Sequence, residues 1–259
     1  MDLNSFDPVA TDYDCFVHDF HGNSDGFVEF HLSLADKYGQ DGILDIACGT
    51  GALTIPLLQS GYDVTALDLS AEMVEATRKK TEKNNLRADL FVANMADFDI
   101  DRKFSLAIIA RSGFMYLLTA QEQRLALLNI RRHLTDGGVL TLNTFQPHPI
   151  MQAESMKASP GEYYPRAEYV NREGKNTRIL YAAVYDHIAQ IMRGSWIFET
   201  LDSAGNVVDA RTYPQVTRHT YRQEMEHLFE LCGYDILNVH NNYRCDAAKD
   251  IFIWVVRKK

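Results

Sequence analysis

Long apolar runs are missing from this sequence of 259 residues. No apolar run approaches the roughly 20 residues that a membrane-spanning helix needs. The first residues, Met1-Asp2-Leu3-Asn4, also lack the basic and apolar parts of a secretory signal. We therefore expect a cytoplasmic protein that makes no membrane contact.

Basic side chains are also scarce. The chain has 26 Lys and Arg against 35 Asp and Glu, a formal net charge of -9. Its two dense basic runs, 78–80 and 257–259, each end an apolar segment, as solvated helix or strand ends do. Nucleic-acid binding needs a clustered basic face. This balance argues against nucleic acid and favours a small-molecule substrate.

Metal-ligand spacings are absent as well. The nine histidines form no His-Glu-x-x-His pattern, and the four cysteines form no Cys-x-x-Cys pair. In a reducing compartment we expect these cysteines to be free thiols that fill small apolar spaces. The sequence predicts no metal site. The cysteines are Cys15, Cys48, Cys232 and Cys245.

What is present is a regular alternation of short apolar runs and helical periodicity over the first 145 residues. Ser70 has the position of a helix N-cap, and Thr119-Ala-Gln-Glu122 has the spacing of a capping box. Such alternation predicts an α/β fold with a doubly wound parallel sheet. The expected strands are 42–46, 63–67, 90–93, 104–110 and 139–145 after a turn at 136–138, and the expected helices 50–60, 70–84 and 119–133.

The alternation breaks between residues 146 and 218. Four prolines indicate a loop or short-helix region, and three segments rich in β-branched and aromatic residues follow it. We interpret 146–218 as an antiparallel sheet inserted into a domain formed by 1–145 and 219–259. The prolines are Pro147, Pro149, Pro160 and Pro165, and the expected strands 177–187, 190–201 and 207–217, with a hairpin turn at 202–206.

The first domain resumes after this insertion. A helix is expected at 220–231, capped by the Thr-x-x-Gln spacing of Thr220 and Gln223. Strands at 235–241 and 251–257 complete the expected fold.

The chemistry is concentrated at the end of the first expected strand, in Asp45-x-x-x-Gly49-x-Gly51. Glycines at a strand-to-helix turn let the backbone approach a ligand closely, and the following helix offers free N–H groups. A dinucleotide site would have Gly-x-Gly-x-x-Gly, but Ala47 stands where a glycine two residues before Gly49 would begin it, and Thr54 stands where the third glycine would follow Gly49-x-Gly51. Asp45 would also repel a pyrophosphate. A zwitterionic amino acid beside a sulfonium cation suits this turn better.

A second acid, Asp68, closes the second expected strand, where it can accept hydrogen bonds from both ribose hydroxyls. The alternative is an acid that merely favours the start of the next helix. With these residues the chain resembles the class I S-adenosylmethionine-dependent methyltransferases, most strongly over 43–145. The resemblance implies S-adenosylmethionine as cofactor and a Rossmann-like, seven-stranded sheet whose last strand is antiparallel.

The resemblance also implies roles for individual residues. Leu69 and Met73 would flank the adenine, and Met95 would offer its backbone N–H to it. Asn94 departs from the family, which usually has Asp there, so Asp97 is an alternative. A carbonyl near Ala110 or Arg111 would receive the methionine ammonium, and Tyr13 would lie across the cofactor. The full predicted cofactor set is Tyr13, Asp45, Ala47, Gly49, Thr50, Gly51, Asp68, Leu69, Met73, Asn94, Met95, Ala110 and Arg111.

Methyl transfer from a sulfonium mainly needs positioning and exclusion of water, because the leaving group is neutral and already activated. A general base helps only if the nucleophile starts protonated. For each candidate below, a purely structural role is the more common one. The candidates for base or substrate contact are His18, His21, Tyr116, His148 and Tyr243.

The insertion leaves the parallel sheet at its carboxyl edge, where open α/β sheets bind ligands. We expect it to roof a small-molecule pocket or to form a homodimer interface, and the sequence leaves both open. Similar insertions occur in amino-sugar N-methyltransferases of the family. Candidate wall residues are Tyr163, Tyr164, Tyr181, Tyr185 and Trp196, although aromatic alternation is normal in any half-buried sheet.

The leading interpretation is a small-molecule N- or O-methyltransferase. A non-catalytic module that binds S-adenosylmethionine or dimerises is a second, which the Asn94 substitution keeps open. An NAD(P)-dependent oxidoreductase is a third, and Asp45 and Ala47 count against it.

Overall fold

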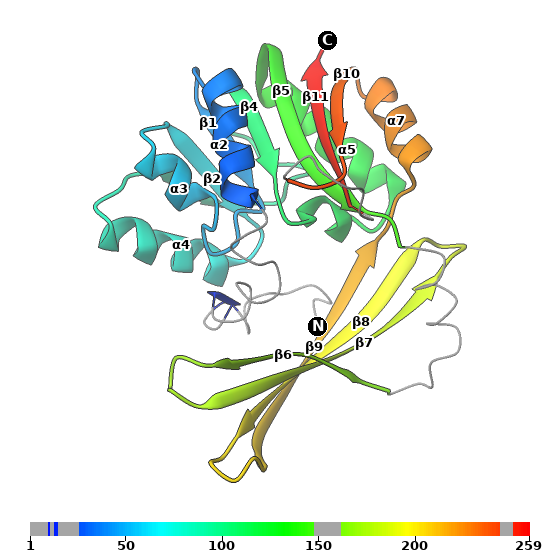
Figure 1. Cartoon of the computed structure of the whole chain (residues 1–259). Helices are drawn as coiled ribbons and strands as arrows, with labels where there is room; N and C mark the ends of the chain where they lie inside the picture. The colour runs from blue at the N-terminus through cyan, green and yellow to red at the C-terminus, as the bar shows by residue number, and fades with distance from the viewer. Residues whose placement is uncertain (1–9, 11–12, 15–25, 148–161, 244–250) are drawn as a thin grey trace.

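The computed structural model describes residues 10, 13–14, 26–147, 162–243 and 251–259. In these ranges a seven-stranded sheet flanked by helices lies above a separate four-stranded sheet (Figure 1). The strands are β1 (Ile43–Ile46), β2 (Val64–Asp68), β3 (Asp89–Val92), β4 (Phe104–Ile109), β5 (Leu134–Phe145), β6 (Tyr164–Val170), β7 (Asn176–Asp186), β8 (Ile191–Leu201), β9 (Val207–Arg218), β10 (Tyr234–His240) and β11 (Ile251–Lys258). The helices are α2 (Phe27–Tyr38), α3 (Thr54–Gln59), α4 (Ala71–Lys83), the 3₁₀ helix η2 (Gly113–Tyr116), α5 (Ala120–His133) and α7 (Arg222–Leu231).

The large sheet has the strand order β10-β11-β5-β4-β1-β2-β3. Strands β1 to β5 are parallel to their neighbours, whereas β11 is antiparallel to both β5 and β10. All four residues of β1 are buried, as expected for a central parallel strand covered on both faces. The predicted doubly wound sheet with an antiparallel last strand is therefore confirmed.

Helices cover both faces of this sheet. On one face, Phe30 of α2 and Leu57 of α3 pack with alternate strand residues such as Ile108. On the other face, Leu127 of α5 and Phe229 of α7 pack around Trp254. Helix α2 is an element that the predicted fold lacks, although its buried residues recur at helical spacing. They are Phe27, Phe30, His31, Leu34 and Ala35.

Two helix starts agree with their predicted caps. The Ser70 hydroxyl accepts from the Met73 N–H at 3.1 Å, and Thr119 and Glu122 form a reciprocal capping box. Two other boundaries were wrong. Helix α3 begins at Thr54 rather than residue 50, because Gly51 has a φ of 83° that no helix accommodates.

Helix α7 also starts later than predicted. Tyr221, not Thr220, occupies its N-cap. The residue three positions later, which closes the cap, is therefore Glu224 and not Gln223. The Glu224 carboxylate pairs with Arg218 at the end of β9 and accepts from Gln190 at 2.7 Å. These partners fix which residue begins the helix, and the local sequence alone does not reveal them.

The inserted sheet has the order β6-β7-β8-β9, and every pair is antiparallel. Strands β7 to β9 lie within one residue of their predicted ranges. Strand β6 was missed because Pro165 indicated a loop. The proline is tolerated at this edge strand, where the pairing with β7 shifts register between Pro165 and Ala167.

The inserted sheet is joined to the large domain by side chains as well as by chain connections. Tyr169, Ile179 and Phe198 of the sheet form an apolar cluster with Met73 of α4. Arg218 of β9 is buried and donates to Gln123 of α5 at 2.8 Å. No helix in the described ranges is long and apolar enough to span a membrane.

Candidate functional site

The glycine-rich loop after β1 alternates into left-handed backbone conformations. The φ angles of Ala47, Gly49 and Gly51 are 55°, 56° and 83°. A Cβ added at Gly51 would meet Thr77 at 3.0 Å, so that glycine is required by packing. A Cβ added at Gly49 would meet nothing within 4 Å. Gly49 therefore faces open space where a ligand can approach the backbone.

Asp68 organises this loop from the end of β2. Its two carboxylate oxygens accept from the backbone N–H of Gly49 at 2.8 Å and of Ser70 at 2.9 Å. The Thr77 hydroxyl holds the carbonyl of Gly49 from α4 at 2.8 Å. A carboxylate has about four acceptor positions, so one such group can serve both the loop backbone and a ribose hydroxyl.

Asp45 lies beneath the loop rather than facing the ligand space. Its side chain is 1% exposed and accepts a hydrogen bond from the Thr54 hydroxyl at 2.6 Å. Burial raises the pKa of this carboxyl to about 7, the Thr54 hydrogen bond opposes the rise, and the nearby Asp68 adds to it. Asp45 thus anchors the start of α3, and burial keeps the pKa of its carboxyl well above the ordinary value.

The residues predicted to contact the adenine differ in their exposure. Leu69 is 60% exposed and offers an apolar surface beside Asp68, whereas Met73 is buried in the cluster shared with the inserted sheet. The Asn94 side-chain oxygen accepts from the Ala96 N–H at 2.9 Å, so it closes its own turn. Met95 is half-buried against the core.

The chain leaves β4 through a strained turn. Arg111 and Ser112 both have positive φ, and the Ala110 carbonyl accepts from the Gly113 N–H at 3.1 Å. Asn143 of β5 braces the turn by accepting from the Ser112 N–H at 2.9 Å. The Arg111 guanidinium lies 4.4 Å from the Phe27 ring centroid, and its buried Nε has no partner in the described structure. That unsatisfied donor suits a carboxylate ligand.

Tyr13 lies close to this turn. Burial raises the pKa of its phenol, with opposing electrostatic contributions from Arg111 and Asp68. Tyr243, a candidate for substrate contact, packs edge-on against Phe27 with ring centroids 5.2 Å apart. The candidates His18, His21 and His148 fall outside the described residues.

Tyr116 is the predicted candidate that the structure brings next to the inserted sheet. The indole Nε1 of Trp196 donates to the Gln215 side-chain oxygen at 2.9 Å, and the Gln215 Nε2 donates to the Tyr116 hydroxyl at 2.7 Å. Burial raises the pKa of Tyr116 far above its ordinary value, so the phenol is neutral. Sequence analysis missed Gln215, because nothing in its local pattern distinguishes it from other strand glutamines.

The predicted wall residues are distributed over the inserted sheet. Tyr181 stacks on Trp196 with ring centroids 4.1 Å apart, and its phenol acts electrostatically on Tyr116. Tyr185 is half-buried with its ring 6.2 Å from that of His219. Tyr163 is half-buried and Tyr164 is half-exposed. Of these wall candidates, Trp196 is linked to Tyr116 through Gln215, and Tyr181 packs on Trp196.

These residues fit S-adenosylmethionine. The open face of Gly49 admits a ligand beside the backbone, Asp68 would hold the ribose, and Leu69 would cover one side of the adenine. The unpartnered Arg111 Nε would meet the carboxylate end of the methionine. The bound cofactor would supply an electrophilic methyl group.

Comparison with known proteins agrees with a site for S-adenosylmethionine. Residues 43–138 match a family model described as a methyltransferase domain. The chain is 32% identical over 114 residues to a putative methyltransferase of a Geobacillus species, covering 44% of this chain and 46% of the relative. It is 30% identical to a dTDP-3-amino-3,4,6-trideoxy-alpha-D-glucopyranose N,N-dimethyltransferase of Streptomyces venezuelae, covering 53% and 58%. It is 27% identical to a glycine/sarcosine N-methyltransferase of Aphanothece halophytica, covering 56% and 55%. The aligned region spans about half the length of these curated relatives.

Solved structures share the fold over nearly the whole chain. A S-adenosylmethionine-dependent methyltransferase from Clostridium acetobutylicum superposes with a TM-score of 0.77 at 17% identity, covering 95% of this chain and 96% of the other. The CcbJ methyltransferase from Streptomyces caelestis superposes with a TM-score of 0.76 at 22% identity, covering 99% and 97%. Residues 43–138 are thus similar to a methyltransferase domain, and the chain shares the Rossmann-like fold of the solved S-adenosylmethionine-dependent methyltransferase.

Proposed function

We propose that this protein transfers the methyl group of S-adenosylmethionine to the nitrogen of a small-molecule amine. The observation that carries the proposal is the hydrogen-bond chain from Trp196 through Gln215 to Tyr116. Through this chain, two side chains of the inserted sheet hold the neutral phenol of Tyr116, which belongs to the large domain.

The chain of hydrogen bonds has only one direction. An indole N–H is a donor only, so it sets the Gln215 oxygen toward Trp196 and the Gln215 amide protons toward Tyr116. The Tyr116 oxygen therefore accepts from Gln215. Its orientation is set before any acceptor arrives, and such preorganisation is what a positioning enzyme requires.

The surroundings of Tyr116 favour an amine over an alcohol. Burial raises the pKa of its phenol most, and Tyr13, Tyr181 and Asp68 raise it further, so aromatic rings and one acid lie near it. Aromatic faces and a carboxylate favour an amine on its way to becoming a cation. An alcohol would need a base, whereas burial holds both Tyr13 and Tyr181 in the neutral form.

The transfer balances without a covalent enzyme intermediate. The lone pair of the neutral amine forms the new N–C bond while the S–C bond breaks and its electrons stay on sulfur. The methylated nitrogen carries the positive charge and then releases a proton to water. Tyr116 would orient the amine, and the inserted sheet would exclude water during the transfer.

The names of relatives point the same way. Two of the matching proteins are named for nitrogen acceptors, an amino sugar and glycine or sarcosine. The net charge of -9 also favours a small cationic acceptor over a nucleic acid. We infer an amino sugar or amino acid as the acceptor class, and a cytoplasmic location.

The test is a panel of acceptors with S-adenosylmethionine, read by mass spectrometry. It would include dTDP-amino sugars, glycine, sarcosine and matched hydroxyl compounds. Methylated amines without methylated alcohols are the expected result, and methyl ethers alone would overturn the nitrogen assignment. If S-adenosylhomocysteine binds and no acceptor reacts, the non-catalytic interpretation is favoured. Thermal stabilisation by NAD but not by S-adenosylhomocysteine would favour the oxidoreductase.

A further inference from the structure

Asp14 connects three separate parts of the chain. Its Oδ1 accepts from the Thr50 hydroxyl at 2.6 Å and from the Lys80 Nζ at 2.8 Å. Its Oδ2 lies 2.7 Å from the same Nζ and 3.5 Å from the guanidinium of Arg172. Thr50 belongs to the glycine-rich loop, Lys80 to α4, and Arg172 to the turn between β6 and β7. One carboxylate thus joins the cofactor loop to the inserted sheet.

The loop side of this junction is tightly held. Thr50 is 1% exposed, and Lys80 also donates to its backbone carbonyl at 2.6 Å. Thr50 stands between Gly49 and Gly51, so fixing both its hydroxyl and its carbonyl restricts the two glycines on either side. The open face of Gly49 is thereby kept in place for a ligand.

Tyr13 precedes Asp14 and is positioned with it. It packs on the apolar cluster that contains Met73 and Tyr169, and Arg111 and Asp68 both act on its phenol. Anchoring Asp14 therefore also holds Tyr13 beside Asp68 and Arg111, the residues that fit the ribose and the methionine carboxylate of the cofactor.

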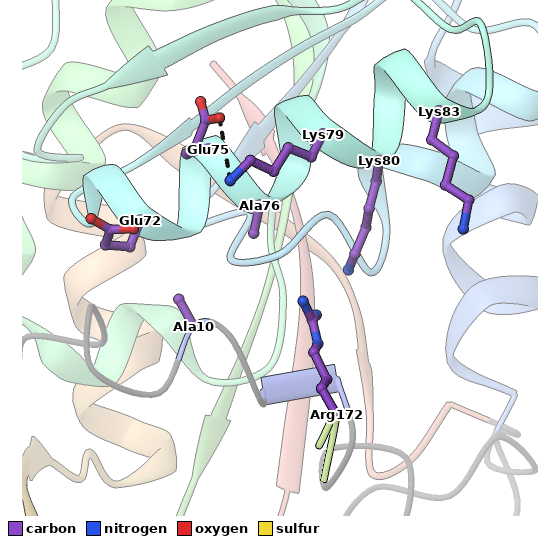
Figure 2. A pocket seen from close by; sticks show the side chains of 8 residues that line it. All are labelled: Ala10, Glu72, Glu75, Ala76, Lys79, Lys80, Lys83 and Arg172. Carbon is purple, nitrogen blue, oxygen red and sulfur yellow. Dashed lines mark ion pairs between the residues drawn. The ribbon is translucent and has the colours of Figure 1, made fainter. Parts of the chain in front are cut away.

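The junction borders a hollow of about 400 Å³ between the outer side of α4 and the inserted sheet. Figure 2 shows Lys80 and Arg172 extending toward each other from opposite sides of it. The side chains of Asp14 and Lys80 are 28% and 30% exposed, so salt can weaken their pairing.

We propose that the hydrogen bond of Asp14 to Thr50 and its ion pair with Lys80, together called the clasp, help to retain the cofactor. Through its own ion pair with Asp14, Arg172 makes this retention depend on the inserted sheet. Asp14 acts as a positioning residue, since it holds Thr50 and Tyr13 rather than the cofactor itself. The proposal is independent of the acceptor.

The experiment measures the binding of S-adenosylhomocysteine to the full chain by calorimetry and its dissociation by stopped flow. We expect Asp14→Asn to raise Kd about 10-fold, mainly through faster dissociation, because charged hydrogen bonds to the loop are lost. Arg172→Gln should raise Kd about 3-fold, as expected for a longer and half-exposed pair. The matched control is Glu75→Gln, which removes one negative charge from the hollow beside the junction; the ion pairs of Glu75 in the described part of the chain are with Arg78 and Lys79, and this variant should leave Kd unchanged.

The double variant Asp14→Asn/Arg172→Gln tests the connection itself. Its Kd should equal that of Asp14→Asn within about 2-fold, because Arg172 acts through Asp14. Wild-type Kd should approach the Asp14→Asn value at about 0.5 M salt. An unchanged Kd in Asp14→Asn, or an Arg172 effect that persists in the double variant, would overturn the proposal.

Hydrogen exchange of the cofactor-free protein provides a second readout. Peptides covering residues 46–52 should exchange faster in Asp14→Asn than in the wild type, with thermal unfolding showing that the variant is folded. Should wild-type protein bind no S-adenosylhomocysteine, the cofactor assignment fails. Exchange in the loop would still decide whether the clasp exists.

Discussion

The Gln215 amide donates to the Tyr116 hydroxyl across 2.7 Å, and the two residues are 99 positions apart in the sequence. One belongs to β9 of the inserted sheet and the other to η2, directly after β4. The inserted sheet therefore sets the orientation of a side chain that the cofactor domain carries.

Gln215→Leu should impair acceptor use while leaving the cofactor site intact. Without the amide, the Tyr116 hydroxyl loses the hydrogen bond from Gln215 that helps to fix its orientation. We expect kcat/KM for the amine to fall about 10- to 100-fold, with Kd for S-adenosylhomocysteine changed less than 2-fold. Arg211→Gln, an exposed position on the same strand, is the control and should retain activity. An equal loss of cofactor affinity would mean that Gln215 is merely structural.

Trp196→Phe separates the hydrogen bond from the packing. A phenylalanine ring can still stack on Tyr181, but it cannot donate to the Gln215 oxygen. The amide of Gln215 is then free to rotate, so we expect a smaller fall in kcat/KM of about 3- to 10-fold. Steady-state kinetics on the same amine measures it, and an unchanged kcat/KM would remove Trp196 from the proposal.

Gly49→Ala should weaken cofactor binding because its new methyl group enters the open face of the loop. Gly61→Ala is a matched control, since Gly61 also has a positive φ and an added Cβ there meets nothing within 4 Å. Both variants bear the backbone strain, about 1 kcal/mol. Calorimetry with S-adenosylhomocysteine should show at least a 10-fold higher Kd for Gly49→Ala alone. Equal affinities would place the cofactor elsewhere.

Asp68→Ala should reduce affinity for S-adenosylhomocysteine by two routes. The variant loses the acceptors of Gly49 and Ser70 as well as the proposed ribose contact. We expect Kd to rise about 100-fold, and Asp68→Asn, which keeps one acceptor oxygen, to have an intermediate value. Asp99→Asn, an exposed acid paired with Arg132, should bind like the wild type.

Asp45 should make stability fall as pH rises from about 4 to 7. Burial raises the pKa of its carboxyl to about 7 from an ordinary 3.8, so in that window the folded chain keeps a proton that the unfolded chain has lost. In the variant Asp45→Asn the amide oxygen can still accept a hydrogen bond from Thr54, and because an amide does not titrate, the variant does not lose this stability as pH rises. Relative to wild type, the variant should gain on the order of 2 kcal/mol between pH 5 and pH 8. Urea unfolding at both pH values measures the gain, and a pH-independent difference would contradict it.

Sequence patterns predicted the large sheet well because its strands and helices carry local signals. The apolar run of β1, the Ser70 cap and the Thr119 box each act within a few residues. The glycine-rich loop and Asp68 were located for the same reason. Boundaries failed where distant partners decide them, as with Glu224 at α7, which Arg218 and Gln190 hold.

The site could be predicted only in part. Asp45 and Met73 stand in the expected motif, but burial turns one toward Thr54 and the other into a cluster with the inserted sheet. Gln215 and the contacts of Asp14 depend on pairings between segments far apart in the sequence. No local pattern encodes such pairings, so they emerge only from the fold.

The two halves of the site differ in what they are made from. Around Gly49 and Ser70 the main chain itself faces Asp68, whereas the inserted sheet contributes only side chains such as Gln215 and Trp196. The backbone pairing of β8 with β9 tolerates many side chains, so point substitutions there would change the walls of the proposed acceptor pocket and leave the strand pairing intact. A deep mutational scan would accordingly divide the molecule into an intolerant donor half and a permissive acceptor half, and acceptor preference can diversify among descendants of this chain while the methyl donor stays the same.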